Sequence, residues 1–202
     1  MSAHKSLVRV LLPLTALSLP LSACAGPRAV RGEEVPGLND EAMSTGLDQR
    51  DLQKLLHENM QALQRSAVIR RWESENRPTV AVLPFRNDTS EHVESQLDAL
   101  ISDVETVLVN AGHVRVVSVE RQPQLVQEVR SQYGDAFDPS KVARWGKQVG
   151  ARYFVTGKVY SSDERQDEER RVQYFMFMQV LDAETSDILF QNKTSLTKAI
   201  VK

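Results

Sequence analysis

The feature that most constrains the fold is a continuous apolar run bounded by prolines, Arg-Pro-Thr-Val-Ala-Val-Leu-Pro-Phe at residues 77–85. A strand covered on both faces is apolar at every position, whereas a strand exposed on one face alternates with polar residues. The run therefore predicts a central strand between two layers. The polar segment 86–90 then predicts a turn, and one of its last three residues can cap the helix that follows.

Amphipathic helices are expected on both sides of this strand in the sequence. Apolar residues recur at helical spacing from about residue 48 to 71, with polar residues opposite. This helix either docks on the domain or presents its apolar stripe to a partner, and docking is favoured. A second stripe, from Val93 to Leu108, predicts a helix that ends at Gly112, where a left-handed cap would sit.

A short strand at 114–119 and two further helices are expected next. The helices open at Pro123 and Pro139, because proline is favoured in the first helical turn. Gly134 and Gly150 are expected to end them.

The last third of the chain is expected to be β-structure. One face of the middle strand is apolar or aromatic at every second residue and should lie on the core. Its other face carries Gln and Phe, so the middle of that face could also be covered. The expected elements are strands at 151–161, 170–182 and 188–196, with a charged turn at 162–169.

The expected element order is α-β-α-β-α-α-β-β-β. Helices between the early strands imply parallel crossover connections, and adjacent late strands imply hairpins. The fold class is therefore α/β, a mixed β-sheet flanked by helices.

The amino terminus has the parts of a secretory signal: a short basic segment, an apolar stretch, and small residues before Cys24. The apolar stretch is shorter than the roughly 20 residues that span a bilayer, and two prolines interrupt it. The tetrad Leu-Ser-Ala-Cys at 21–24 resembles a bacterial lipobox. This resemblance implies lipid attachment (diacylglycerol on the sulfur) at Cys24 and removal of the signal peptide, 1–23. Ala25, where a retention signal would have Asp, implies sorting to the outer membrane.

The mature chain is expected to have two parts. Gly and Pro recur through 24–46 with no helical or strand period, which predicts a lipidated flexible tether. A single globular α/β domain is expected over 47–202. Cys24 is the sole cysteine of the 202 residues, so an intrachain disulfide framework and a Cys-rich zinc site are excluded.

The residues that carry chemistry are sparse. The four histidines are not spaced as a zinc ligand set requires, and the motifs His-Glu-x-x-His and Gly-x-Ser-x-Gly are absent. Lys158 follows a glycine but lacks the glycine-rich loop of a phosphate site, so an ordinary strand lysine is expected. We expect a binding protein rather than an enzyme, with no catalytic residue, cofactor, metal or small-molecule substrate. A hydrolase that uses a carboxylate pair is the remaining enzymatic alternative.

The net charge of the chain and the positions of two polar loops indicate which class of partner it binds and where. Lys and Arg number 25 against 27 Asp and Glu, and the resulting net charge of −2 argues against a general nucleic-acid binder. The charged turn at 162–169 is interpreted as a solvated hairpin tip, with a calcium-binding or partner-docking loop as the alternative. Arg86, Asn87 and Asp88 are the predicted partner contacts, because ligands often bind at strand ends in α/β sheets.

The stretch Arg-Pro-Thr-Val-Ala-Val-Leu-Pro-Phe-Arg-Asn-Asp-Thr-Ser-Glu-His at 77–92 resembles the LpoB-type family, outer-membrane lipoprotein activators of penicillin-binding proteins. The segments 112–117, 150–158 and 180–185 fall in the family's order, so the resemblance covers roughly 47–200. It implies a fold similar to the amino-terminal domain of the Tol–Pal propeller protein.

The family's role implies a lipoprotein held by Cys24 on the periplasmic face of the outer membrane. It would dock on a bifunctional class A penicillin-binding protein and stimulate peptidoglycan synthesis, and thereby support cell wall biogenesis and cell shape. Family members that bridge the periplasm are expected to have a long Pro-rich tether, whereas this one is short. The partner is therefore expected to supply part of the reach, or to be another envelope protein.

The alternative is a structural or accessory lipoprotein of an outer-membrane secretion or assembly system, similar to the curli-secretion group. That role requires long strands that face lipid. The sequence indicates one long hairpin, whose tip is charged, and this favours the activator.

Overall fold

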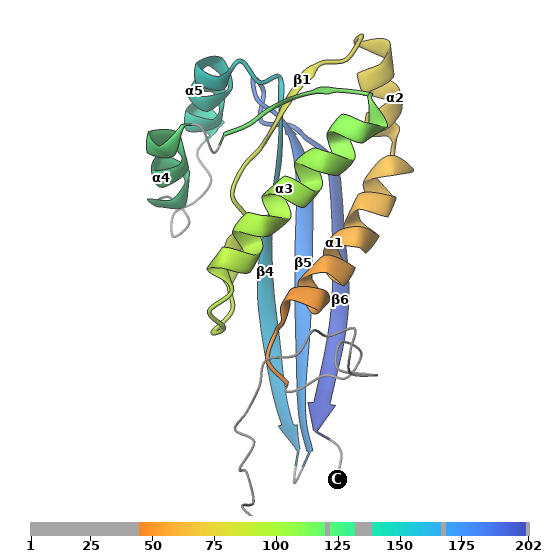
Figure 1. Ribbon diagram of the computed structural model, residues 1–202, viewed down its shortest axis with the longest axis vertical. Helices are drawn as coiled ribbons and strands as arrows, with labels where there is room; N and C mark the ends of the chain where they lie inside the picture. The colour runs from red at the N-terminus through yellow and green to blue at the C-terminus, as the bar shows by residue number, and fades with distance from the viewer. Residues whose placement is uncertain (1–44, 120–121, 132–138, 167–168, 201–202) are drawn as a thin grey trace, which may run out of the picture. The chain divides into compact units, whose positions relative to one another are not determined.

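A six-stranded mixed sheet with helices on both faces organises the chain, as the computed structural model shows (Figure 1). The structure describes residues 45–119, 122–131, 139–166 and 169–200, which belong to one compact unit, 42–202. The boundaries of signal peptide, tether and domain stay predictions. The elements are α1 (Gln49–Gln64), α2 (Ala67–Ser74), β1 (Thr79–Val82), β2 (Arg86–Asp88), α3 (Glu94–Ala111), β3 (Arg115–Val117), α4 (Pro123–Ser131), α5 (Pro139–Val149), β4 (Tyr153–Gln166), β5 (Glu169–Asp182) and β6 (Ile188–Ile200).

The strand order is β3-β1-β4-β5-β6, and β2 pairs with β4 farther along the same edge as β1. β1 is parallel to β3 and β4, while β4, β5 and β6 form antiparallel hairpins. This arrangement confirms the predicted mixed sheet, with crossover connections early in the chain and hairpins late.

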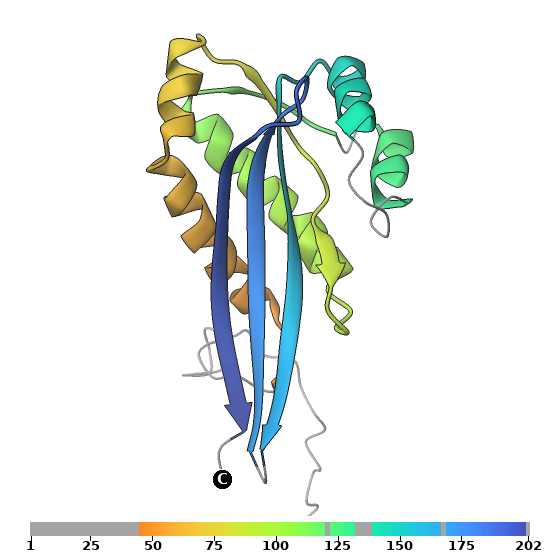
Figure 2. The ribbon, with the colours of Figure 1, turned by 180° about the vertical axis from the view of Figure 1, so that it is seen from behind.

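β1 is covered on both faces, as its continuous apolar sequence predicts. Val80 and Val82 belong to a core with α1, α2 and α3, whereas Ala81 and Leu83 belong to a second core with α4 and α5. All four are essentially inaccessible to solvent. Figure 1 shows α1 and α3 across one face of the sheet, and Figure 2 shows the opposite face.

The helix predicted at 48–71 is two helices, which corrects the sequence interpretation. The Ser66 amide bonds the Leu63 carbonyl at 2.9 Å, and the Ser66 hydroxyl accepts from the Val68 amide at 3.3 Å. Ser66 therefore ends one helix and caps the next. The expected docking of the stripe is confirmed, because Leu52, Leu55, Leu56, Met60 and Leu63 are buried on the domain.

The predicted turn at 86–90 is wrong in its first half, since 86–88 form the short strand β2 beside β4. The predicted capping of the next helix is also wrong, because α3 follows Val93 without a side-chain cap. At its other end Gly112 has a φ of 74°, the left-handed conformation that the sequence predicts.

The late strands are longer than predicted. β4 and β5 pair in continuous register as far as Gln166 and Glu169, so only 167–168 separate them, and those two residues lie outside the described part. β6 continues to Ile200, which makes β5–β6 a second long hairpin where the sequence indicated one. Within the residues described, no helix has the length and hydrophobicity of a membrane span.

Candidate docking surface

The three predicted contact residues form β2, at an edge of the sheet. The Arg86 guanidinium donates to Asp88 Oδ2 from Nε at 3.0 Å and from Nη2 at 2.5 Å. Lys158 Nζ, on the neighbouring strand β4, lies 3.9 Å from the same oxygen. Arg86 and Asp88 are each about a third exposed, so this edge presents a carboxylate between two cations.

Asn87 has a different position, because its side chain points into the loop that follows. Its amide donates to the Glu91 carbonyl at 2.7 Å and to Glu94 Oε1 at 3.0 Å. Its oxygen accepts from the Thr89 amide and hydroxyl. The bond from Asn87 lowers the pKa of the Glu94 carboxyl. Asn87 thus shapes the loop, while Arg86 and Asp88 face solvent.

A row of side chains crosses four strands from this edge. Arg86 on β2 is in register with Lys158 on β4, Lys158 with Phe177 on β5, and Phe177 with Lys193 on β6. Residues in register share a face of the sheet, and strands lie about 4.8 Å apart. We call these four residues the basic row. Its two lysines are therefore separated by about 10 Å across the sheet.

Two stacked rings lie next to the basic row. Tyr160 and Phe175, paired in register, have ring centroids 4.9 Å apart and planes inclined by 17°. Lys158 Nζ lies 5.5 Å from the Tyr160 centroid, and Lys193 Nζ lies 5.2 Å from the Phe175 centroid. Each ammonium group is thus held over an aromatic ring, an attractive arrangement. The rings position the two lysines.

The basic row and the stacked rings together form what we call the open face. It lies on the side of the sheet opposite α1 and α3, and no helix crosses in front of β4, β5 and β6 in Figure 2. The other side chains on this face of the three strands include Gln173, Gln179 and Thr197, and Gln173 donates to Thr197 at 3.3 Å. The surface is polar, aromatic and basic.

A second cluster of charged groups surrounds Tyr153, at the opposite end of β4 from the hairpin tip. The buried Tyr153 hydroxyl donates to the Glu75 carboxylate, with both oxygens at 2.7 Å. Burial and this bond raise the pKa of Tyr153. Arg152 bonds the buried Asp182 at 2.9 Å, and Arg71 bonds Glu75. These groups are mutually paired, so the cluster closes the end of the fold and offers no free nucleophile or base.

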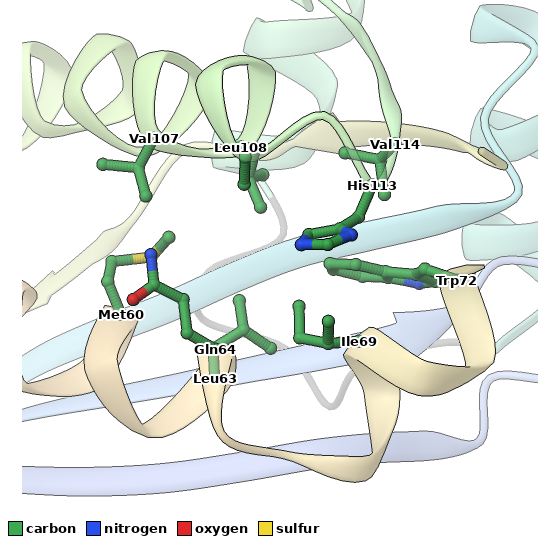
Figure 3. A pocket seen from close by; sticks show the side chains of 10 residues that line it. Met60, Leu63, Gln64, Ile69, Trp72, Val107, Leu108, His113 and Val114 are labelled. Carbon is green, nitrogen blue, oxygen red and sulfur yellow. The ribbon is translucent and has the colours of Figure 1, made fainter.

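An apolar crevice lies between α1, α2 and α3 (Figure 3). Trp72, Leu108 and His113 are among the residues that line it. Its volume of about 10 Å³ is close to that of one water-sized probe, so it has no room for a larger ligand. The open face, in contrast, has exposed side chains such as Lys193 that can contact a macromolecular partner.

A protein-family comparison matches residues 51–196 to the family described as peptidoglycan-synthase activator LpoB. The match spans most of the chain, from α1 to β6. The chain belongs to this family. Its membership favours the activator role over the secretion-assembly alternative. A sequence comparison with curated proteins finds no match.

Solved structures similar to this LpoB-family chain include two of the family's own domains. The LpoB C-terminal domain from Escherichia coli has 18% identity and a TM-score of 0.40, over 59% of this chain and 82% of that chain. The corresponding domain from Salmonella enterica has 20% identity and a TM-score of 0.39, over 59% and 82%. Lipoprotein GNA1162 from Neisseria meningitidis has 14% identity and a TM-score of 0.41, over 60% and 83%. The expected likeness to the Tol–Pal propeller protein stays a prediction.

Two of the predicted site residues of this LpoB-family chain lie on the open face. β2 brings Arg86 and Asp88 to the open face, whereas Cys24 lies outside the described residues. In the part of the chain that is described, no cluster of His, Cys, Asp and Glu is arranged to hold a metal. Sequence reasoning missed Lys158 and Lys193 as surface groups. The register of β4 and β6 with β5, which no local sequence pattern gives, places them on one face with Phe177.

Proposed function

We propose that this LpoB-family chain is an outer-membrane lipoprotein, anchored through Cys24 on the periplasmic face, that binds and activates a bifunctional class A penicillin-binding protein. The observation that carries the proposal is the family match over 51–196, which includes nearly all the described elements. In this role the chain is not an enzyme. It acts by binding the active conformation of the synthase better than the resting one.

The short tether sets a condition on the partner. Residues 24–46 span at most about 80 Å when fully extended, and roughly 25 Å as a flexible coil. α1 adds no reach, because its apolar stripe is buried against the sheet and α3. The synthase must therefore extend toward the outer membrane to meet the domain.

Partner contact is proposed at β2, through Arg86, Asn87 and Asp88. Arg86 and Asp88 offer an exposed charged pair at a sheet edge, and Asn87 holds the adjoining loop in shape. Alanine at Arg86 and Asn87 together is expected to reduce stimulation. Unaltered stimulation by this double variant, with its fold verified by circular dichroism, would remove β2 from the contact.

The test of the function is a glycan-polymerisation assay. Each purified class A penicillin-binding protein of the source bacterium is supplied with lipid-linked precursor, with and without the full-length chain in detergent. We expect faster polymerisation and crosslinking with one of them, and no glycan product from the chain alone. An absence of stimulation for every synthase would refute the proposal. Product formed without a synthase would refute the non-enzymatic role.

A further inference from the structure

The open face has an excess of positive charge on a chain whose net charge is −2. Arg86, Lys158 and Lys193 lie in the basic row, and the exposed Arg171 lies farther along β5 on the same face. Among the described side chains, Asp88 is the carboxylate on this face, and it already contacts Arg86 and Lys158. An anionic surface is therefore the electrostatic complement of this face.

The stacked rings indicate which anionic surface fits. A sugar binds an aromatic ring through the face of the ring, but Tyr160 and Phe175 cover each other on one side. Lys158 and Lys193 lie over these rings as well. The ring faces are thus occupied by protein groups, which disfavours a glycan strand as the main ligand.

A lipid surface also fits poorly. Proteins that lie on membranes insert large apolar side chains between the lipids. In the described part of the chain, Val109 and Ile188 are the large hydrophobic residues that are exposed, and neither is part of the basic row or the stacked rings. The aromatic side chains of this face, in contrast, are typical of protein–protein interfaces, and cations across such an interface orient a partner of opposite charge.

We propose that the open face docks on an acidic protein surface, with Lys158 and Lys193 as the main contacts. The inference rests on the proposed function, because it assigns that acidic surface to the synthase that the chain activates. The two ammonium groups, about 10 Å apart and supported by rings, meet carboxylates of the partner. Such complementarity mainly raises the association rate and fixes the orientation of the partners.

The test compares two glutamine double variants that have the same net charge, together with an arginine double variant that has the charge of the wild type. Lys158→Gln with Lys193→Gln removes the two cations of the open face, while Lys54→Gln with Lys147→Gln removes two exposed cations from α1 and α5. Lys158→Arg with Lys193→Arg keeps the charge. Binding of each full-length variant to the purified class A synthases is measured at 0.1 M and 1 M salt, where the Debye length is about 10 Å and 3 Å. Urea midpoints verify that all variants fold.

At 0.1 M salt we expect the open-face glutamine variant to bind about tenfold more weakly than the wild type, and the α1/α5 and arginine variants to bind normally. The difference should shrink at 1 M salt, because exposed charges are screened. If the wild type binds a synthase and the open-face variant binds equally well, the inference is wrong and the proposed function stands. If the wild type binds none, the proposed function fails.

Two further binding experiments test whether the open face binds a glycan or a membrane in place of a protein. Isolated peptidoglycan sacculi and anionic phospholipid vesicles are sedimented with the wild type and with the open-face variant. We expect the two proteins to sediment equally with each. A loss of sedimentation that is specific to Lys158→Gln with Lys193→Gln would assign the face to a glycan or a membrane and would overturn the acidic-protein assignment.

Discussion

Replacing Asn59 with alanine should strongly destabilise the domain, because this buried amide joins α1 to two strands. Asn59 Nδ2 lies 2.8 Å from Thr194 Oγ1, 3.0 Å from the Leu55 carbonyl and 3.3 Å from the Met176 carbonyl. Its oxygen accepts from Asn192 Nδ2 at 3.0 Å. The side chain is fully excluded from solvent.

The expected loss of stability depends on which hydrogen bonds the partners of Asn59 can replace when its side chain is removed. The Thr194 hydroxyl still reaches the Leu55 carbonyl at 3.0 Å, and Asn192 is only half-buried and can turn to water. The loss is then about two hydrogen bonds at roughly 1 kcal/mol each, with roughly 1 kcal/mol more for the cavity. A total of about 3 kcal/mol corresponds to a fall in Tm of about 6–12 °C for a domain of this size.

Urea unfolding followed by tryptophan fluorescence measures this loss, because Trp72 and Trp145 are both buried. Gln53→Ala, at an exposed position of α1, is the control and should change stability by less than about 0.5 kcal/mol. A double-mutant cycle with Thr194→Val should give a coupling of about 1 kcal/mol. The reasoning would be refuted if Asn59→Ala lowered the free energy of unfolding by less than about 1 kcal/mol. It would also be refuted if the cycle showed no coupling between Asn59 and Thr194.

Three shorter predictions concern charge, packing and anchoring. Burial opposes ionisation of Asp48, but the bonds from Lys198 hold the pKa of Asp48 below its ordinary value of 3.8. Its stabilising effect is then present above about pH 4 and is lost as the pH falls through the folded pKa. Lys198→Met should lower the urea midpoint at pH 7 and flatten its decline in acid, and an equally steep decline would contradict this. Gly157→Ala should lower the free energy of unfolding in urea by about 1–3 kcal/mol. The added Cβ would lie 2.5 Å from Phe85 Cε1 and closer still to the Phe177 carbonyl oxygen. An unchanged urea midpoint would show that the strands can move apart. Cys24→Ser should abolish palmitate labelling and membrane association in cells, and a label that persists would place the lipid elsewhere.

The sheet was largely predictable because its signals are local. Val80 and Val82 alternate with Ala81 and Leu83, and an apolar residue at every position needs cover on both faces, which the two cores provide. The left-handed conformation of Gly112 follows from glycine's lack of a Cβ. These features depend on residues within one element, so a single sequence is enough to find them.

The errors arise where distant residues decide the structure. Asn87 and Asp88 favour turns, but pairing of Arg86–Asp88 with Lys158–Tyr160 of β4 makes the segment a strand. The apolar stripe continues past Ser66, so its spacing gives no sign of the break between α1 and α2. The three cations of the basic row come from three different strands, β2, β4 and β6, and lie far apart in the sequence. Such a surface becomes visible only when the register is known.

The start of the domain, at Thr45 and Gly46, is held on the face of the sheet opposite the basic row. The Tyr174 hydroxyl donates to the Thr45 carbonyl at 2.8 Å, and Lys198 Nζ donates to the Gly46 carbonyl at 2.9 Å. Both side chains are buried on the side of the sheet that α1 covers. If the chain is anchored through Cys24, tension along the tether acts at Thr45 and Gly46 and is resisted by these bonds. The contacts that hold the anchored end and those proposed to meet the partner therefore use opposite faces of the same sheet, so the two can be engaged together.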